Sequence, residues 1–186
     1  KIFSILKNFE LYKILNESLK NNKILKYKKN FNYKSIFKQE YKLIINCESY
    51  NEITKKFFSN KITKNYNSSA YTTIINHKKI SKNDTATQIF TNNGPIAFLP
   101  LSYDKTSIVY SHRFNKKEIK VDIGNLIKKF NPKYKITKIE NISKFELTSS
   151  NLRKYYQDNI LAFGDMLHKI HPLAGQGFNM SLRDIR

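Results

Sequence analysis

The 186-residue sequence has a single cysteine, no tryptophan, five glycines and four prolines. One cysteine, Cys47, excludes an intrachain disulfide and suits a reducing compartment. Neither a Cys/His spacing of the zinc-binding type nor an apolar run approaching the ~18 residues needed to span a bilayer is present. What remains is a chain with 40% hydrophobic residues, which is the composition of a globular protein able to bury a core.

Acidic residues are also scarce. The sequence has 14 of them against 34 lysines and arginines, which gives a net charge of +20. Such a surplus is typical of proteins that bind nucleic acid or an anionic surface. However, nearly all the basic residues are lysines, and they are scattered without the arginine and aromatic clustering of a base-stacking surface. The codon bias of an A/T-rich genome therefore explains the charge better than nucleic-acid binding does, and a basic face toward anionic lipid stays open as an alternative.

The most informative segment is residues 159–186, NILAFGDMLHKIHPLAGQGFNMSLRDIR. Its first five residues predict a short buried strand that ends at Gly164 and Asp165, which places an acid at the carboxyl end of a strand, where ligands collect in open α/β sheets. Gly175 and Gly177 flank Gln176, so the backbone could approach a flat ligand without a Cβ in the way. The helix expected next would point its partly positive N-terminus at the same crevice.

This segment resembles the second flavin-binding motif of the FAD-dependent aromatic hydroxylases, and more narrowly of their ubiquinone-biosynthesis branch. Many fixed offsets within so few residues make the match specific. The one departure is Met166-Leu167, where that family usually has small residues. The matching residues are Gly164, Asp165, His168, His171, Pro172, Gly175, Gln176, Gly177, Asn179, Arg183 and Asp184.

A second stretch supports the resemblance. Residues 93–101, NGPIAFLPL, followed by residues 107–111, SIVYS, are similar to the substrate-domain sheet of the same family. The resemblance implies that Phe98, Leu99 and Pro100 contact the substrate, although a plain role in the sheet core explains Phe98 and Leu99 equally well.

Two family features are missing or altered. None of the five glycines forms the Gly-x-Gly-x-x-Gly turn that binds the ADP half of FAD, so we expect an internal fragment of a longer protein. Where the family has an Asp-Gly motif that contacts flavin and pyridine nucleotide, this sequence has Glu48 and Ser49, and Ser49 lacks the conformational freedom of glycine.

The expected fold is α/β, with part of a Rossmann-like FAD-binding domain and an inserted antiparallel substrate domain, as in the para-hydroxybenzoate hydroxylase-like flavoproteins. We expect residues 1–65 and 151–186 to belong to the flavin domain and residues 66–150 to the substrate domain. Periodicity predicts helices from Asn8, with a core-facing apolar side, and over 122–130. Alternating and β-branched segments predict strands at 24–28, 41–46, 71–76, 87–91, 96–101, 106–112, 134–139 and 142–147.

The resemblance implies a monooxygenase that hydroxylates a phenolic ring with FAD, NAD(P)H and dioxygen, with no side chain acting as catalytic base. Asp165 would bind the ribityl hydroxyls of FAD, and the amides near Gly175, Gln176 and Gly177 would face its pyrimidine edge. Pro172 would shape the loop and Asn179 would brace the helix start. The expected location is the cytoplasm or the periphery of the inner membrane face. The candidate partners are an aromatic substrate, with or without a polyprenyl tail, and a biosynthetic complex.

Other interpretations remain. A catalytically degenerate flavoprotein acting as a scaffold would explain Glu48 and Ser49, and a basic nucleic-acid-binding module would explain the charge. The histidines His168 and His171, near Asp165, could form a metal pair, but the His-Pro and Gly-Gln-Gly context favours shaping of a flavin-site loop.

Overall fold

The computed structural model describes residues 7–28, 32–114, 121–169 and 176–185. By contacts, the chain divides into two compact parts. Unit 1 comprises Lys1–Tyr27 and Asn67–Glu146, and unit 2 comprises Lys28–Tyr66 and Leu147–Arg186. Each unit is described by itself.

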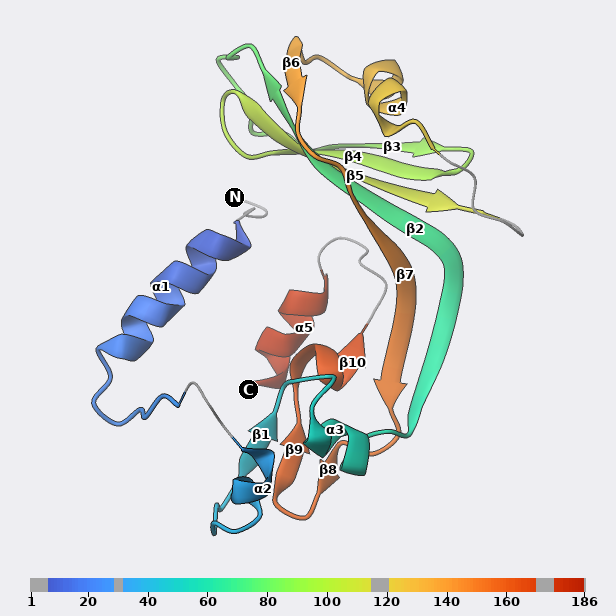
Figure 1. Ribbon diagram of the computed structural model, residues 1–186. Helices are drawn as coiled ribbons and strands as arrows, with labels where there is room; N and C mark the ends of the chain where they lie inside the picture. The colour runs from blue at the N-terminus through green and yellow to red at the C-terminus, as the bar shows by residue number, and fades with distance from the viewer. Residues whose placement is uncertain (1–6, 29–31, 115–120, 170–175, 186) are drawn as a thin grey trace. The chain divides into compact units, whose positions relative to one another are not determined.

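The elements follow the labels of Figure 1. The helices are α1 (Asn8–Lys20), α2 (Tyr33–Ile36), α3 (Glu52–Phe57), α4 (Ile123–Phe130), the 3-10 turn η1 (Gly164–Met166) and α5 (Gln176–Asp184). The strands are β1 (Ile44–Asn46), β2 (Lys61–His77), β3 (Thr87–Thr91), β4 (Gly94–Pro100), β5 (Lys105–Arg113), β6 (Ile136–Ile139), β7 (Ser143–Leu152), β8 (Tyr156–Gln157), β9 (Ile160–Ala162) and β10 (His168–Lys169).

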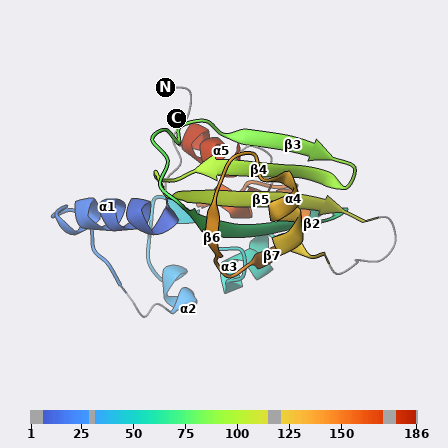
Figure 2. The same cartoon turned by 90° about the horizontal axis from the view of Figure 1, so that it is seen from above.

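Unit 1 is built on an antiparallel sheet in which β2, β5, β4 and β3 are successive neighbours, with β6 pairing the end of β2 (Figure 2). The register aligns Tyr71 with Tyr110 and Tyr110 with Ile96 across three strands. Alternate residues of a strand point to opposite faces of a sheet. The register therefore shows which residues of β2, β5 and β4 share a face of the sheet.

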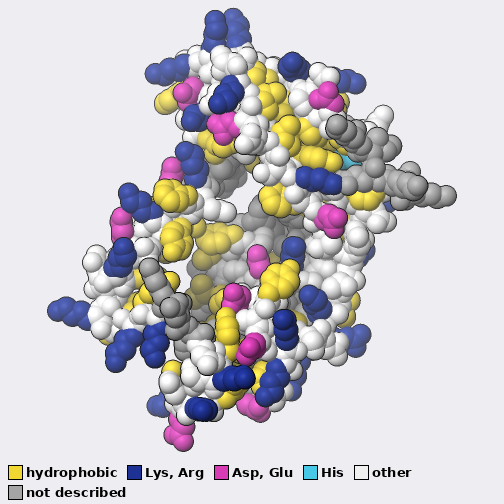
Figure 3. Space-filling view, in the orientation of Figure 1, with side chains coloured by type: hydrophobic (Ala, Val, Ile, Leu, Met, Phe, Trp, Pro, Cys, Tyr) yellow, Lys and Arg dark blue, Asp and Glu magenta, His cyan; other side chains and the backbone are white. Residues whose placement is uncertain are grey.

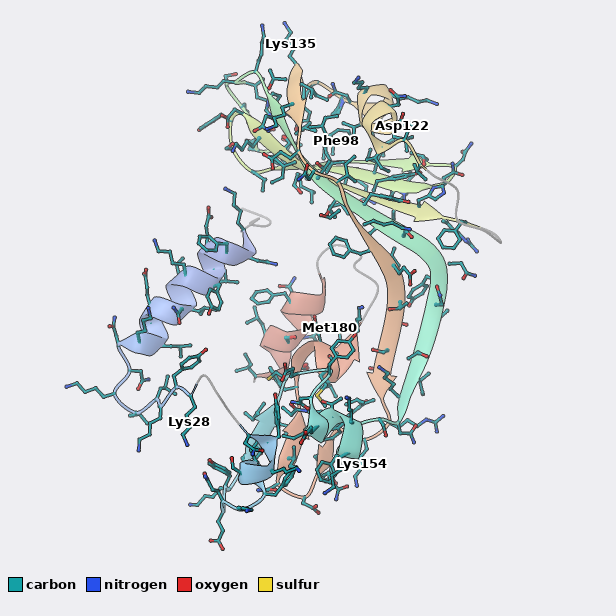
Figure 4. The ribbon with its side chains drawn as sticks, in the orientation of Figure 1. Lys28, Phe98, Asp122, Lys135, Lys154 and Met180 are labelled. Atoms are coloured by element: carbon teal, nitrogen blue, oxygen red, sulfur yellow. The ribbon has the colours of Figure 1, made fainter. Side chains whose placement is uncertain are left out.

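One face of this sheet forms the core of unit 1. Ile75, Ile96, Phe98 and Ile108 are fully buried there and pack with residues of α4. Helix α4 is capped at its N-terminus by Asp122, whose carboxylate accepts a hydrogen bond from the Asn125 amide at 3.0 Å. This cap satisfies one of the unpaired amides at the helix start, and Figure 4 shows Asp122 at that position.

Unit 2 contains the parallel pair expected of a Rossmann-like domain. Strand β1 pairs β9 in parallel, and β8 pairs β9 in the antiparallel direction. Around these strands a second core forms from Ile36, Ile53, Phe58, Leu152, Ile160, Ala162 and Met166. A parallel pair together with an antiparallel sheet confirms the α/β class predicted from the sequence. The assignment of residues 1–65, 66–150 and 151–186 to flavin and substrate domains stays a prediction.

Most strands of the sequence prediction are confirmed with shifted ends, and β3 agrees at both ends. The strand predicted at 24–28 is wrong, because those residues form turns and irregular backbone. Helix α1 does form, but the expectation of a core-facing side is wrong for the described residues, since none of its residues is buried and Ile14 and Leu19 are 62% and 55% exposed. The short α2, α3, β8 and β10 were not predicted.

Basic side chains are spread over the visible face of both units rather than gathered in one patch (Figure 3). This distribution agrees with the dispersed lysines of the sequence. Among the described helices, none combines the length and the apolar character required to cross a bilayer.

Gly94, at the start of β4, provides a test of the unit 1 sheet. Its φ is +133°, and a Cβ added there would lie 2.0 Å from the Ser111 carbonyl oxygen. We expect Gly94→Ala to lower the free energy of unfolding by about 1–3 kcal/mol from backbone strain alone, with the clash adding to it. Denaturant titration measures the change. Gly124→Ala is the control, because its Cβ meets only ordinary contacts, and it should leave stability unchanged or raise it by up to about 1 kcal/mol. An equal loss of stability in both variants would contradict the left-handed backbone and the close approach to Ser111 described for Gly94.

Candidate functional site

Two loops of unit 2 leave neighbouring parallel strands at the same edge. Asn46, the last residue of β1, is paired with Ala162, the last residue of β9. The ladder extends one step further, because the Phe163 amide donates to the Asn46 carbonyl at 3.0 Å. Since the strands are parallel, the residues that follow Asn46 and those that follow Phe163 emerge side by side.

The first of these loops is the Gly164-Asp165 turn. Gly164 has a φ of +68°, a left-handed conformation that favours glycine, and it turns the chain out of β9 into η1. The Leu167 amide closes the turn by donating to the Gly164 carbonyl at 2.9 Å. Asp165 is exposed, whereas Met166 beside it is buried. The turn therefore presents a carboxylate outward and is anchored by the next side chain.

A buried polar network joins this turn to the loop after β1. The Asn46 amide group donates to Thr54 Oγ1 at 2.9 Å and to the Met166 sulfur at 3.1 Å. Asn51 in turn donates to Asn46 Oδ1 at 2.6 Å and caps α3 by accepting from the Thr54 amide at 2.8 Å. Asn46 and Asn51 are 4% and 8% exposed, so their hydrogen bonds are shielded from water. Such satisfied networks fix one arrangement of the groups they join.

Glu48, in the loop after β1, is held by two neighbouring side chains. The Tyr33 hydroxyl donates to Glu48 Oε2 at 2.6 Å, and the Asn51 amide lies 3.4 Å from the same oxygen. The hydrogen bond to Glu48 raises the pKa of Tyr33 above its ordinary value, with smaller contributions from burial and from the carboxylate charge. The Glu48 carboxylate is thus occupied by hydrogen bonds from two other residues of unit 2.

Helix α5 packs beside the turn. The His168 Nε2 lies 3.1 Å from an Asp184 carboxylate oxygen, and the two form an ion pair when the imidazole is protonated. The Ser181 hydroxyl lies 4.0 Å from the position of a Cβ on Gly164. Helix α5 and strand β10 thus both contact the turn that contains Gly164.

The predicted cofactor residues fall into two groups. Gly164, Asp165, Gly177 and Asn179 are described, and all belong to the turn or to α5. Pro172 and Gly175, together with His171, lie outside the described residues, and Gln176 is described only as the first residue of α5. Within the described part of the chain, no group of His, Cys, Asp and Glu has the arrangement of a metal site.

The predicted substrate residues do not share one face. Phe98, labelled in Figure 4, is fully buried in the core beneath α4, and Pro100 lies on the same side of β4. Leu99 points to the opposite face, where the register pairs it with Ser107, and it is half-buried. The burial of Phe98 therefore supports a role in the sheet core. Contacts of Phe98, Leu99 and Pro100 with the substrate stay predictions.

Sequence reasoning missed Asn46, Asn51, Thr54 and Tyr33. One signal was available, because Asn51 followed by Glu52 is the pattern of a helix N-cap. The contact between Asn46 and Met166 joins residues more than a hundred positions apart, and no local pattern reveals it.

The described residues fit a flavin. Asp165 offers an exposed acceptor for hydroxyl groups. A Cβ added to Gly177 would meet no described atom within 4 Å, so a planar ligand could approach the backbone there. Both features lie on elements that pack together, η1 and α5.

Asn46→Ala tests the network. It removes the acceptor for Asn51 and the donor to Met166, so we expect a loss of about 1–3 kcal/mol in the free energy of unfolding, measured by denaturant titration. The adjacent exposed residue gives a control, Cys47→Ala, which should change stability by less than about 0.5 kcal/mol. A loss in Asn46→Ala no larger than in the control would contradict a stabilising role for the network.

A second test concerns Tyr33. Because a raised pKa means that folding favours the neutral phenol, its hydrogen bond to Glu48 contributes stability below the ordinary tyrosine pKa and loses it as pH rises through the raised value. We expect Glu48→Gln to lower the pKa of Tyr33. Tyrosinate absorbance of each protein, minus that of its Tyr33→Phe counterpart, isolates this group. An unchanged titration would show that Glu48 does not hold the phenol.

Comparison with known proteins agrees with the geometry. The family model described as "FAD binding domain" matches residues 97–186. The 3-demethoxyubiquinol 3-hydroxylase of Escherichia coli (strain K12) is 32% identical over 111 residues, covering 55% of this chain and 28% of that protein. The human mitochondrial ubiquinone biosynthesis monooxygenase COQ6 is 24% identical over 185 residues, covering 77% of this chain and 40% of that protein. The chain thus spans well under half the length of these curated relatives.

Among solved structures, the anhydrotetracycline hydroxylase OxyS from Streptomyces rimosus matches with a TM-score of 0.51 at 15% identity, over 76% of this chain and 30% of that one. At this identity the likeness concerns the fold. Taken with the FAD-binding match and the sequence relatives, it agrees with the parallel pair, the glycine turn and the antiparallel sheet described above. Residues 97–186 thus match a model of an FAD-binding domain, and the chain is similar to a 3-demethoxyubiquinol 3-hydroxylase and to a ubiquinone biosynthesis monooxygenase.

Proposed function

We propose that the protein containing this chain is an FAD-dependent monooxygenase that hydroxylates a phenolic ring in ubiquinone biosynthesis, using NAD(P)H and dioxygen. The human relative is named a ubiquinone biosynthesis monooxygenase, and the Escherichia coli relative is named a 3-demethoxyubiquinol 3-hydroxylase. When bound, the flavin supplies the oxygen-transfer chemistry, and the protein binds, orients and shields the reactants.

The observation that carries the proposal is the Gly164-Asp165 turn. It follows the buried strand β9, adopts a left-handed φ of +68° at Gly164, exposes Asp165 and packs against α5. An exposed carboxylate at the carboxyl end of a parallel strand is suited to bind the hydroxyl groups of a cofactor. We propose that Asp165 accepts hydrogen bonds from the ribityl hydroxyls of FAD.

The N-terminal end of α5 has a complementary role. Its first amides have no partner inside the helix and carry partial positive charge. We propose that amides around Gly175, Gln176 and Gly177 face the pyrimidine edge of the flavin, where negative charge accumulates on reduction. Pro172 would shape the preceding loop, and Asn179 would brace the helix.

For the substrate, we propose the sheet face opposite α4. Leu99 is on this face together with Ile74 and Val109, by the register of β2, β5 and β4, and all three are half-buried. Apolar side chains on a rigid sheet suit an aromatic ring. A polyprenyl tail on the ring would favour peripheral association with a membrane, because such a substrate partitions into the bilayer.

One observation favours a second candidate, a flavin-binding protein that has lost turnover. Glu48 is engaged by Tyr33 and Asn51, and Ser49 replaces a glycine of the family pattern. If the loop after β1 handles the pyridine nucleotide in this family, such changes would impair reduction while leaving FAD binding intact. Reduction by NAD(P)H distinguishes the two candidates.

Asp165→Ala in the whole protein tests the site. We expect a yellow wild-type protein that is bleached by NAD(P)H, and a variant whose FAD affinity is lower by about tenfold or more, because a charge-assisted hydrogen bond is lost. Flavin fluorescence measures the affinity. Asp165→Asn, which keeps an acceptor oxygen, should retain more affinity than Asp165→Ala.

The outcomes separate the proposals. A wild-type protein that does not bind FAD would overturn the function, and FAD binding without reduction by NAD(P)H would favour the second candidate. Unchanged FAD affinity in Asp165→Ala would remove Asp165 from the site.

A further inference from the structure

A pocket of ≈ 310 Å³ lies in unit 1 where β2 and β5 meet the residues that join β6 to β7. Every residue that lines it belongs to unit 1. The volume is at the lower end of the range of small-molecule sites, about 300–1,000 Å³. The pocket is therefore of a size for a small ring rather than for a whole cofactor.

The strand register sets a row of four side chains across the sheet face opposite α4. Ile74 of β2 is paired with Ser107 of β5, and Ser107 is paired with Leu99 of β4. On the other side of β2, the Glu140 amide donates to the Ile74 carbonyl at 2.9 Å, which continues the pairing of β6 with β2 and sets Glu140 beside Ile74. The row therefore starts with a carboxylate at the pocket and ends with an apolar side chain on β4.

The Glu140 carboxylate lies on this face. The Asn76 side-chain amide donates to Glu140 Oε1 at 3.2 Å, and Asn76 points to the same face as Ile74, two positions earlier in β2. The hydrogen bonds found among the described residues leave Glu140 Oε2 without a donor, although the side chain is half-buried. A carboxylate accepts up to about four hydrogen bonds. Glu140 can therefore accept a further hydrogen bond from a ligand in the pocket.

Other polar groups surround the carboxylate. Thr72 of β2 and Ser107 of β5 present hydroxyls from the same face, and Asn141 lines the pocket beside Glu140. Thr73 points to the core instead, and its hydroxyl donates to the Glu140 carbonyl at 2.8 Å. This bond holds the backbone that carries the carboxylate. The β2 side of the face is thus polar and fixed in place.

The opposite side of the same face is apolar. Leu99 and Ala97 of β4 share it with Val109 of β5, and the register adds Phe90 of the edge strand β3, which is 80% exposed. Apolar side chains on a rigid sheet suit the apolar part of a ligand. A ligand with a hydroxyl group at one end and an apolar substituent at the other end therefore matches this face.

We propose that the Glu140 carboxylate accepts a hydrogen bond from a ring hydroxyl of the substrate, and that the apolar substituent of the ring extends over β5 and β4 toward Leu99. The proposal rests on the proposed function, which supplies a phenolic substrate. It assigns the side of the face that receives the hydroxyl. It also names a residue that selects phenols over rings whose hydroxyl is blocked, since a hydrogen bond to a charged acceptor is about twice as strong as one between neutral groups.

The test uses two ligands that differ in one group, para-octylphenol and its methyl ether, para-octylanisole. They have the same ring and the same apolar chain, but only the phenol donates a hydrogen bond. Calorimetry measures the affinity of the whole protein for each ligand. We expect the wild-type protein to bind the phenol about tenfold or more tightly than the ether, because the ether leaves the buried side of the carboxylate without a donor.

Glu140→Gln should reduce this preference. The amide keeps the size of the side chain and an oxygen for Asn76, but it removes the charge that strengthens the hydrogen bond. We expect the preference for the phenol to fall to about threefold or less, while the affinity for the ether changes by less than about twofold. Glu146→Gln is the matched control, because Glu146 is an exposed acid of the same unit, and it should keep the wild-type preference. Circular dichroism checks that both variants fold.

Leu99→Ala tests the direction of the ligand. It shortens an apolar contact that the two ligands share, so both affinities should fall by a similar factor of about threefold or more, and the preference for the phenol should stay. Affinities for both ligands that match those of the wild-type protein would overturn the proposed path of the apolar substituent.

The remaining outcomes separate this proposal from the proposed function. Equal losses for the phenol and the ether in Glu140→Gln would show a structural role and overturn the proposal, as would an unchanged preference in that variant. A wild-type protein that binds FAD but not para-octylphenol would also overturn it. A protein that does not bind FAD, yet loses its preference for the phenol in Glu140→Gln alone, would support the ring site while the proposed function fails.

Discussion

The parallel pairing of β1 with β9 is the interaction on which the candidate site depends. It aligns Asn46 with Ala162 and so brings two distant loops to one edge of unit 2. Without this register, the Gly164-Asp165 turn would have no neighbour to hold Met166, and the loop after β1 would have no fixed partner. Because side chains alternate along a strand, a slip of one residue would also reverse which side chains enter the core.

Departures from the family pattern occur at residues that contact the same network. Met166 stands where the family usually has a small residue, and its sulfur accepts from Asn46. Glu48 lies on the facing loop and is bound by Asn51, which also bonds Asn46. A thioether is a weak but adaptable acceptor that fills irregular space. The larger side chain is therefore accommodated by a polar partner.

Much of the architecture was predictable because it is local. β-Branched alternation located β3, β4 and β5, the helical period located α4, and the end of the apolar run at residues 159–163 located the Gly164-Asp165 turn. The network around Asn46 was not predictable, since its partners are joined by pairing of distant strands. The prediction of a core-facing side for α1 was wrong for a related reason. Periodicity shows that a helix has an apolar face, but not what covers that face. Phe98 and Leu99 illustrate the same limit, because only the strand register separates their faces.

The crossings between the units occur inside strands. Residues 66 and 67 lie within β2, residues 146 and 147 lie within β7, and these two strands are neighbours in the sheet. Pairing of β1 with β9 in an unfolded chain would have to close a loop of more than a hundred residues, at an entropic cost of about 4 kcal/mol. Once unit 1 is folded, the two ends of its segment already lie on neighbouring strands, and most of that cost has been met. Folding of residues 67–146 before β1 pairs with β9 would therefore lower the entropic cost of that pairing.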